Sequence, residues 1–108
     1  ESLVYVSSVA ALHGEADLPL YSSCKAALVG LTKSLSSKGP TRVNCILPGF
    51  VSTGLVKNGE SLPTKFLDVE SSSTSVAEAI LFLAEHTSIN GAELILDKGL
   101  LTKVWRWV

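Results

Sequence analysis

The stretch RVNCILPG, residues 42–49, is a short apolar run that ends at a proline and a glycine. Its length, its β-branched residues and its Pro-Gly stop predict a strand over residues 42–47. A similar run, LVYVS at residues 3–7, predicts an earlier strand buried on both faces. Between the two runs, apolar residues recur at helical spacing. Strand, helix and strand in this order predict parallel strands joined by a right-handed crossover.

The helix between these strands is expected from about Leu20 to Ser37, where Gly39-Pro40 stops it. One stripe of its surface is expected to be buried against the sheet. The residues of this stripe are Leu20, Cys24, Ala27, Leu28, Leu31 and Leu35. Cys24 and Cys45 are therefore both expected to be buried, inert thiols of a reducing compartment rather than a disulfide.

The second half of the chain continues the alternation. Residues 50–74 are rich in Ser, Gly, Asn and Lys and predict a loop. A capping box from Ser75 to Glu78 predicts the start of a second helix, which runs to about Glu85. Asn90-Gly91 predicts a turn, and residues 92–96 a third strand. Residues 100–108, which contain Trp105 and Trp107, are expected to form a tail.

Composition narrows the class of protein. The 108 residues fit at most one domain, because domains usually have about 100–200 residues. With 46% hydrophobic and 18% charged residues, the chain is not expected to be disordered. A net charge of −1 gives no electrostatic footprint for nucleic acid or an anionic membrane. Two cysteines and two distant histidines, His13 and His86, predict no metal site.

The chain has no methionine and opens almost directly on its first predicted strand. We therefore expect it to be part of a longer gene product. No apolar run approaches the roughly 18 residues needed to span a bilayer, and no signal peptide is recognisable. The expected location is cytoplasmic, and a mitochondrial location stays open because the true N-terminus is not seen.

Three residues carry candidate chemistry. Tyr21 and Lys25 are four residues apart and share one face of the predicted helix. An ammonium near a phenol favours the phenolate, so such a tyrosine can exchange a proton with a substrate oxygen. Ser8 lies just beyond the carboxyl end of the first strand, where ligands bind in open parallel sheets. The second strand ends at the same edge, so these side chains are expected to converge on one crevice.

The spacing of these residues resembles a known family. Ser8 followed by Tyr21-x-x-x-Lys25, and the run RVNCILPGFVST at residues 42–53, are similar to the C-terminal half of a classical short-chain dehydrogenase/reductase. Asn90-Gly91 and the LDKG segment at residues 96–99 resemble that family's last strand and its closing Asp-Gly-Gly. The resemblance implies half of a Rossmann-like, doubly wound α/β sheet, with three strands and two main helices, as a partial domain over residues 1–108.

The resemblance also implies roles. Ser8 would hold the substrate oxygen by a hydrogen bond, and Tyr21 would be the general acid in reduction or the base in oxidation. Lys25 would hydrogen-bond the nicotinamide ribose and favour the Tyr21 phenolate. The cofactor, NAD or NADP, would supply the hydride. Contacts to the cofactor are expected from Tyr21, Lys25, Pro48, Gly49, Val51 and Thr53.

The chain departs from the family pattern in several places. The glycine-rich dinucleotide turn and the catalytic asparagine belong to the upstream half and are not present. Lys98 stands where the family has a glycine, and the segments after Lys25 and after Thr53 are short.

We expect the parent protein to be an oxidoreductase that acts on a small-molecule carbonyl or secondary alcohol. Its Pro-Gly-Phe-Val-x-Thr run most resembles the 3-oxoacyl-carrier-protein reductases. The resemblance implies a homodimer or homotetramer, with no nucleic acid and no membrane as partner. The isolated 108-residue chain is expected to be inactive. The alternatives are an inactive, truncated paralogue or fragment that acts as an interaction module, and a small α/β domain in which Tyr21 and Lys25 are incidental.

Overall fold

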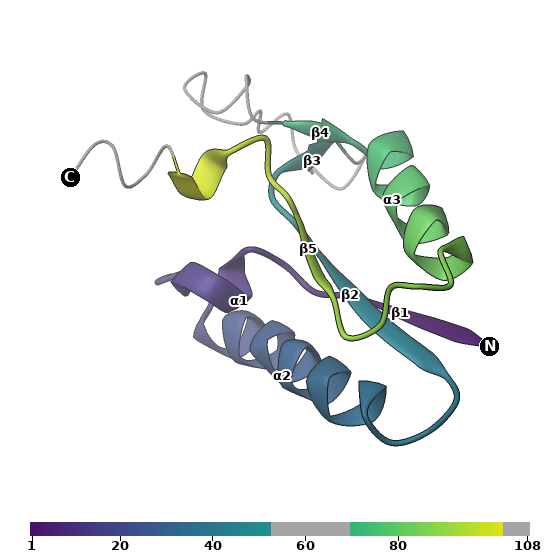
Figure 1. Ribbon diagram of the computed structural model, residues 1–108. Helices are drawn as coiled ribbons and strands as arrows, with labels where there is room; N and C mark the ends of the chain where they lie inside the picture. Colours follow the sequence, from purple (N-terminus) through teal and green to yellow (C-terminus); the bar gives the residue numbers. More distant parts are fainter. Residues whose placement is uncertain (53–69, 103–108) are drawn as a thin grey trace.

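Strand β2 (Arg42–Pro48) is the middle strand of a three-stranded parallel sheet, in the order β1-β2-β5. Its neighbours are β1 (Ser2–Val6) and β5 (Glu93–Leu96). In this computed structural model, which describes residues 1–52 and 70–102, helix α2 (Pro19–Ser36) lies on one face of the sheet and α3 (Ser73–Glu85) on the other (Figure 1). The predicted α/β class with parallel strands and crossover helices is confirmed.

The core lies along β2. Val43, Cys45, Ile46 and Leu47 are at most 2% exposed, because this strand has a neighbour at each edge and a helix over each face. Burial raises the pKa of the Cys45 thiol, so the side chain stays protonated and behaves as a small apolar residue. The predicted burial of the thiol is confirmed for Cys45.

Strand β1 is less buried than its apolar sequence predicts. It pairs with β2 in the register Val4↔Asn44 and lies at the edge of the described sheet. Leu3 and Val6 are about 40% exposed. The prediction that both faces of this strand are buried is therefore wrong for the described residues, because the strand has a partner on one side only.

Helix α2 buries only part of the predicted stripe. Leu20 is 80% exposed and Leu31 is 41% exposed, and Cys24 and Ala27 are also exposed. Leu28 and Leu35 of the stripe are half-buried, and Thr32 is the buried residue of the helix. The predicted burial is therefore wrong for Leu20, Cys24, Ala27 and Leu31.

Two side chains from other elements also hold the helix, because Ser7 donates to the Lys25 carbonyl and Asn90 donates to the Ser36 carbonyl. Thr32 is fully buried, and its hydroxyl donates to the Leu28 carbonyl within the helix. This bond satisfies the hydroxyl, so the side chain can pack against the sheet at little cost.

The shorter elements also differ from the predicted boundaries. Helix α1 (Ala10–His13) occupies part of the segment predicted as a loop after β1. Within the predicted loop of residues 50–74, β3 (Val51–Ser52) and β4 (Ser71–Ser72) form a parallel pair. Helix α3 begins one turn earlier than predicted: Ser72 is its N-cap and accepts a hydrogen bond from the Ser75 amide, so the predicted capping role of Ser75 is wrong.

Side chains at the start of β2 hold the connection between α3 and β5. The Arg42 guanidinium donates to four carbonyl oxygens near the end of α3, those of Leu83, Ala84, His86 and Ile89, at 2.6–3.0 Å. The carbonyl groups of Leu83 and Ala84 lie in the last turn of α3, which a helix leaves without partners, and those of His86 and Ile89 lie in the segment that follows. Arg42 therefore caps α3 from a neighbouring strand.

Two asparagines complete this connection. Asn44 is fully buried; its amide donates to the Ile89 carbonyl and its side-chain oxygen accepts from the Ala92 amide. Asn90 accepts from the Val43 amide and donates to the Ser36 carbonyl, so it joins the turn to β2 and to the end of α2. Gly91 takes a φ of +79° in the predicted turn, a conformation that favours glycine.

Residues 97–101 form a turn directly after the carboxyl end of β5. The Asp97 carboxylate accepts hydrogen bonds from the Gly99 and Leu101 amides, and Leu100 is buried beside it. Lys98 has a φ of +50°, in the left-handed region. Leu100 thus belongs to the folded part of the chain, whereas Trp105 and Trp107 of the predicted tail lie outside the described residues.

None of the helices in residues 1–52 and 70–102 combines the length and the apolar character that a membrane crossing requires.

Replacing Arg42 by lysine tests the cap. A lysine ammonium has no planar fork and cannot reach four carbonyl oxygens together, so we expect Arg42→Lys to lower the free energy of unfolding by about 2 kcal/mol. Urea unfolding of the two proteins measures the difference. The matched control is Lys33→Ala, which removes the surface ion pair between Lys33 and Glu93 and should cost at most about 1 kcal/mol. Equal losses in both variants would contradict the capping role.

Replacing Lys98 by glycine tests the strain in the turn. A side chain with a left-handed backbone costs about 1–2 kcal/mol, part of which glycine returns through its greater freedom in the unfolded chain. We expect Lys98→Gly to raise the free energy of unfolding by about 0.5–1 kcal/mol, measured by urea unfolding. Lys98→Ala keeps the Cβ and should give no gain. A gain of the same size in the alanine variant would assign the effect to the lost charge instead.

Candidate active site

The carboxyl ends of the three strands meet at one edge of the sheet. The Val9 amide donates to the Pro48 carbonyl at 3.0 Å, and the Gly49 amide donates to the Leu96 carbonyl at 2.9 Å. These bonds extend the strand pairing into the segments that follow β1 and β2. A cavity of about 590 Å³ lies at this edge, which is where open parallel sheets bind their ligands.

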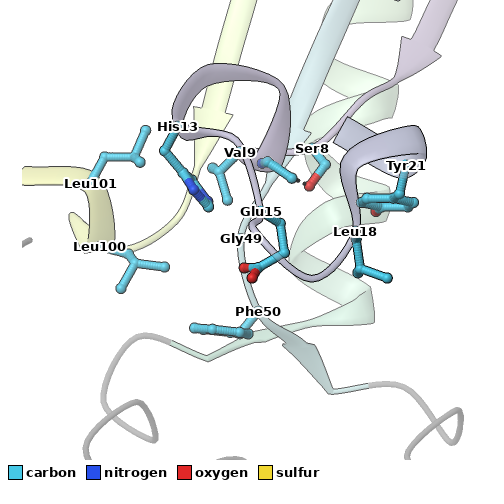
Figure 2. Close-up of a pocket in the computed structure, with 11 residues that line it drawn as sticks. Ser8, Val9, His13, Glu15, Leu18, Tyr21, Gly49, Phe50, Leu100 and Leu101 are labelled. Atoms are coloured by element: carbon cyan, nitrogen blue, oxygen red, sulfur yellow. Dashed lines mark hydrogen bonds between the residues drawn. The ribbon is translucent and has the colours of Figure 1, made fainter. Parts of the chain in front are cut away.

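The wall of this cavity is mostly apolar, with four polar side chains. Ser8, His13, Glu15 and Tyr21 are the polar ones (Figure 2). The remaining lining residues are Val9, Ala10, Leu18, Gly49, Phe50, Leu100 and Leu101. The structure therefore brings Ser8 and Tyr21, two of the three predicted catalytic residues, into one cavity.

Ser8 is held rigidly at the end of β1. Its side chain is 9% exposed, and its Oγ accepts a hydrogen bond from the Ala10 amide at 3.1 Å. A serine hydroxyl has one proton to donate and two lone pairs to accept with. The bond from Ala10 uses a lone pair, which leaves the proton available to a ligand oxygen in the cavity.

Tyr21 lies in the first turns of α2 and is 44% exposed, with its ring at the cavity wall. The Lys25 Nζ atom lies 5.6 Å from the centroid of this ring, as the four-residue spacing predicts. Lys25 is not itself part of the wall: its ammonium donates to the Val6 carbonyl at 3.1 Å. It stands behind Tyr21 and joins α2 to the end of β1.

Two further serines position these groups. The buried Ser7 hydroxyl donates to the backbone carbonyl of Lys25 at 2.7 Å, so β1 holds the middle of α2 directly. The Ser22 Oγ accepts from the Glu15 amide at 2.8 Å and joins α2 to the loop before it. Both anchor points on α2 lie within four residues of Tyr21, so they limit the rotation of the part of the helix that carries the tyrosine.

Of the residues expected to contact a cofactor, Tyr21 and Gly49 line the cavity. Gly49 lines the cavity beside Tyr21, and Pro48 and Val51 lie next to it in β2 and β3. A Cβ at Gly49 would lie 3.1 Å from the Asp97 Cβ, so glycine is needed there for β2 and β5 to approach. Thr53 lies outside the described residues.

The cavity fits the reactive end of a dinucleotide but not the whole molecule. A volume of about 590 Å³ is in the range of small-molecule sites and exceeds what one aromatic ring requires. The sequence offers no glycine-rich turn of the kind that binds pyrophosphate at a helix N-terminus. The residues present therefore suit a nicotinamide ring and its ribose beside Tyr21 and Gly49.

Most of the cavity wall was not singled out from the sequence. The leucines and Phe50 come from three separate segments, and only folding brings them together. His13, the last residue of α1, has an exposed side chain that also lines the cavity. For Glu15, the one feature of the sequence that points to the cavity is its position between Ser8 and Tyr21.

Within residues 1–52 and 70–102, no three histidine, cysteine or acidic side chains are grouped so that they could hold a metal ion.

Comparisons with known proteins agree with this geometry. A family model described as enoyl-(acyl carrier protein) reductase matches residues 1–101. A 3-oxoacyl-[acyl-carrier-protein] reductase from Bos taurus is 35% identical over 105 residues, which cover 92% of this chain and 44% of that protein. A short-chain dehydrogenase/reductase from Botryotinia fuckeliana is 34% identical over 116 residues, covering 91% of this chain and 45% of that protein.

A solved structure supports the same assignment. The crystal structure of 3-hydroxyacyl-CoA dehydrogenase type-2 from Mycobacterium avium superposes with a TM-score of 0.80 at 30% identity, covering 90% of this chain and 42% of that one. The chain thus spans about 44% of the length of the curated relatives it matches. With the match over residues 1–101 and with Ser8 and Tyr21 in one cavity at the sheet edge, the chain belongs to the short-chain dehydrogenase/reductase family.

Proposed function

We propose that the protein carrying this chain transfers a hydride between NAD or NADP and a carbonyl or secondary alcohol, with Tyr21 as the general acid and base. The observation that carries this proposal is the placement of Ser8 and Tyr21 in the wall of one cavity at the carboxyl edge of the sheet. The family membership supports the reaction class. Because some relatives are named reductases and others dehydrogenases, the proposal covers both reduction and oxidation.

The two hydroxyl groups divide the work on the substrate oxygen. The Ser8 hydroxyl donates its proton to that oxygen. The bond from the Ala10 amide uses only one lone pair of Oγ and leaves this proton free. Tyr21 delivers a proton to the same oxygen as the carbonyl is reduced, and takes it back in the oxidative direction. The bound nicotinamide supplies or accepts the hydride.

Lys25 supports Tyr21 from outside the cavity. Its Nζ atom lies 5.6 Å from the centroid of the Tyr21 ring, so the two side chains are neighbours on one face of α2. One of the three N–H bonds of the ammonium is used by the Val6 carbonyl. The other two are free for the ribose hydroxyl groups of a dinucleotide, the role that the family resemblance implies.

The apolar part of the wall favours an acyl substrate. Leu18, Phe50, Leu100 and Leu101 offer a surface that suits a hydrocarbon chain next to the reacting carbonyl. Relatives from several mammals are named 3-oxoacyl-[acyl-carrier-protein] reductases. We therefore propose a 3-oxoacyl thioester, or a compound of similar shape, as the substrate class.

Replacing Tyr21 by phenylalanine tests the proposed chemistry. In the complete protein that carries this chain, we expect Tyr21→Phe to lower kcat for carbonyl reduction by about 10²- to 10⁴-fold, because the proton donor is lost while the ring remains. Ser8→Ala should lower kcat by about 10²-fold. Consumption of NADH or NADPH with a 3-oxoacyl thioester measures both.

The matched control is Tyr5→Phe, which removes a phenol hydroxyl from β1. It should retain turnover. Equal turnover by wild type and Tyr21→Phe would refute the role of Tyr21. A folded wild-type protein with no turnover would favour the alternative of an inactive interaction module. The 108-residue chain alone should show no turnover, since its sequence has no glycine-rich phosphate-binding turn.

Helix α2 is proposed as the surface through which subunits assemble. Leu20, Cys24 and Leu31 lie along its outer face and are exposed. An apolar stripe of this kind on a helix is stabilised when a second apolar surface covers it. Together with the oligomeric habit of the family, this stripe supports a homodimer or a homotetramer.

A charge placed in the stripe tests this assembly. We expect Leu31→Glu to convert the complete protein to smaller species in light scattering coupled to gel filtration, because burial of an unpaired carboxylate is costly. Leu81→Glu places the same charge at an exposed leucine of α3, on the other face of the sheet, and should keep the wild-type mass. Dissociation by Leu81→Glu alone would move the interface to α3 and contradict the proposal.

A further inference from the structure

Two polar side chains of the cavity have no part in the proposed proton transfer. His13 ends α1, Glu15 lies in the loop between α1 and α2, and both line the same cavity as Ser8 and Tyr21 (Figure 2). Apart from these four polar residues, the lining side chains are apolar or glycine. Any charge in such a wall strongly influences which ligand enters, because few polar groups are there to compensate it.

Glu15 places a carboxylate in the cavity wall. The residue is half-buried, and its backbone amide donates to the Ser22 Oγ at 2.8 Å, which holds it against α2. Figure 2 shows the carboxylate pointing into the space above the Phe50 ring. Among the described residues, no side chain or backbone group makes a hydrogen bond or an ion pair with this carboxylate.

No lysine or arginine in the described wall offsets this charge. The eleven lining residues include neither type. The nearest candidate along the chain is Lys25, whose ammonium is directed to the Val6 carbonyl behind the Tyr21 ring. A ligand in the cavity therefore meets the negative charge of Glu15 directly.

His13 adds a second acceptor rather than a fixed positive charge. Its Nδ1 lies 2.9 Å from the Gly14 carbonyl oxygen. A carbonyl oxygen can only accept, so Nδ1 carries the proton and Nε2 presents a lone pair in the neutral ring. The two side chains together offer acceptors to a ligand and no donor in this state.

We propose that Glu15 makes this cavity select uncharged carbonyl substrates, such as thioesters and amides of 3-oxo acids, and reject the free carboxylates. This inference rests on the proposed function and specifies its substrate class. Two carboxylates about 6 Å apart at a partly exposed site repel each other enough to change affinity by about tenfold. The apolar wall does not distinguish the two forms, because it contacts the hydrocarbon part that they share.

The test uses two probes of nearly the same shape, acetoacetamide and acetoacetate, with the complete protein. We expect wild type to prefer the neutral amide, and Glu15→Gln to reduce that preference by about tenfold in the ratio of kcat/KM values. The change should appear mainly in KM for acetoacetate, with kcat for the amide unchanged. Glutamine keeps the size of the side chain and the backbone bond to Ser22.

The matched control is Glu78→Gln, which makes the same change in net charge at an exposed position of α3. It should leave the ratio at the wild-type value. An unchanged ratio in Glu15→Gln, or an equal shift in Glu78→Gln, would overturn the assignment of specificity to Glu15.

A binding measurement separates this inference from the proposed reaction. Ligand-observed NMR titration of both probes gives their affinities without turnover. If wild type binds the amide more tightly and Glu15→Gln abolishes the difference, Glu15 acts as proposed even where no reduction occurs, and the proposed function alone fails. If both proteins bind the two probes with the same ratio of affinities, the selection by Glu15 is refuted, whatever the turnover.

Discussion

The Arg42 guanidinium is the interaction on which the arrangement of the sheet depends. It begins β2 and satisfies four carbonyl oxygens at the end of α3, so the helix on one face is tied to the central strand. Asn44, two residues further along β2, bonds the Ile89 carbonyl and the Ala92 amide in the segment that leads into β5. With these groups satisfied, the register Pro48↔Leu96 follows, and the Gly49 amide meets the Leu96 carbonyl. The cavity lies at that junction.

The opposite face of the sheet is organised by hydroxyl groups. Ser7 and Ser22 fix α2 through backbone carbonyl and amide groups, and Asn90 reaches the carbonyl of Ser36 at the end of the helix. Hydrogen bonds are directional, whereas apolar contacts tolerate rotation and sliding. A helix that carries Tyr21 into a cavity benefits from the directional kind of contact. Leu20 and Leu31 are left exposed on the outer face of the helix.

The sequence predicts the elements of this fold better than it predicts which way they face. The two main helices, the three strands and the placement of Ser8 and Tyr21 at one edge follow from local periodicity and from the rules for parallel sheets. The leucine stripe of α2 has the same period whether it faces the sheet or solvent, and the orientation depends on long-range contacts such as the bonds of Ser7 and Asn90. The cap at Ser72 was missed because Ser75-x-x-Glu78 has the same form one turn later. The apolar cavity wall depends on contacts between distant segments, which no local pattern contains.

Tyr21, the proposed general acid, and Glu15, the proposed charge selector, are held by one contact. Tyr21 and Ser22 are adjacent in α2, and the Ser22 hydroxyl holds the backbone of Glu15. Any shift of α2 therefore moves Tyr21 and Glu15 together, so the distance between the proton donor and the carboxylate changes little. Leu100, by contrast, depends on the Asp97 turn after β5 and not on α2. Glu15, which is proposed to select ligands by charge, and Leu100, which contacts the apolar part of a ligand, are thus held by separate elements. A substitution at one of them should leave the other undisturbed.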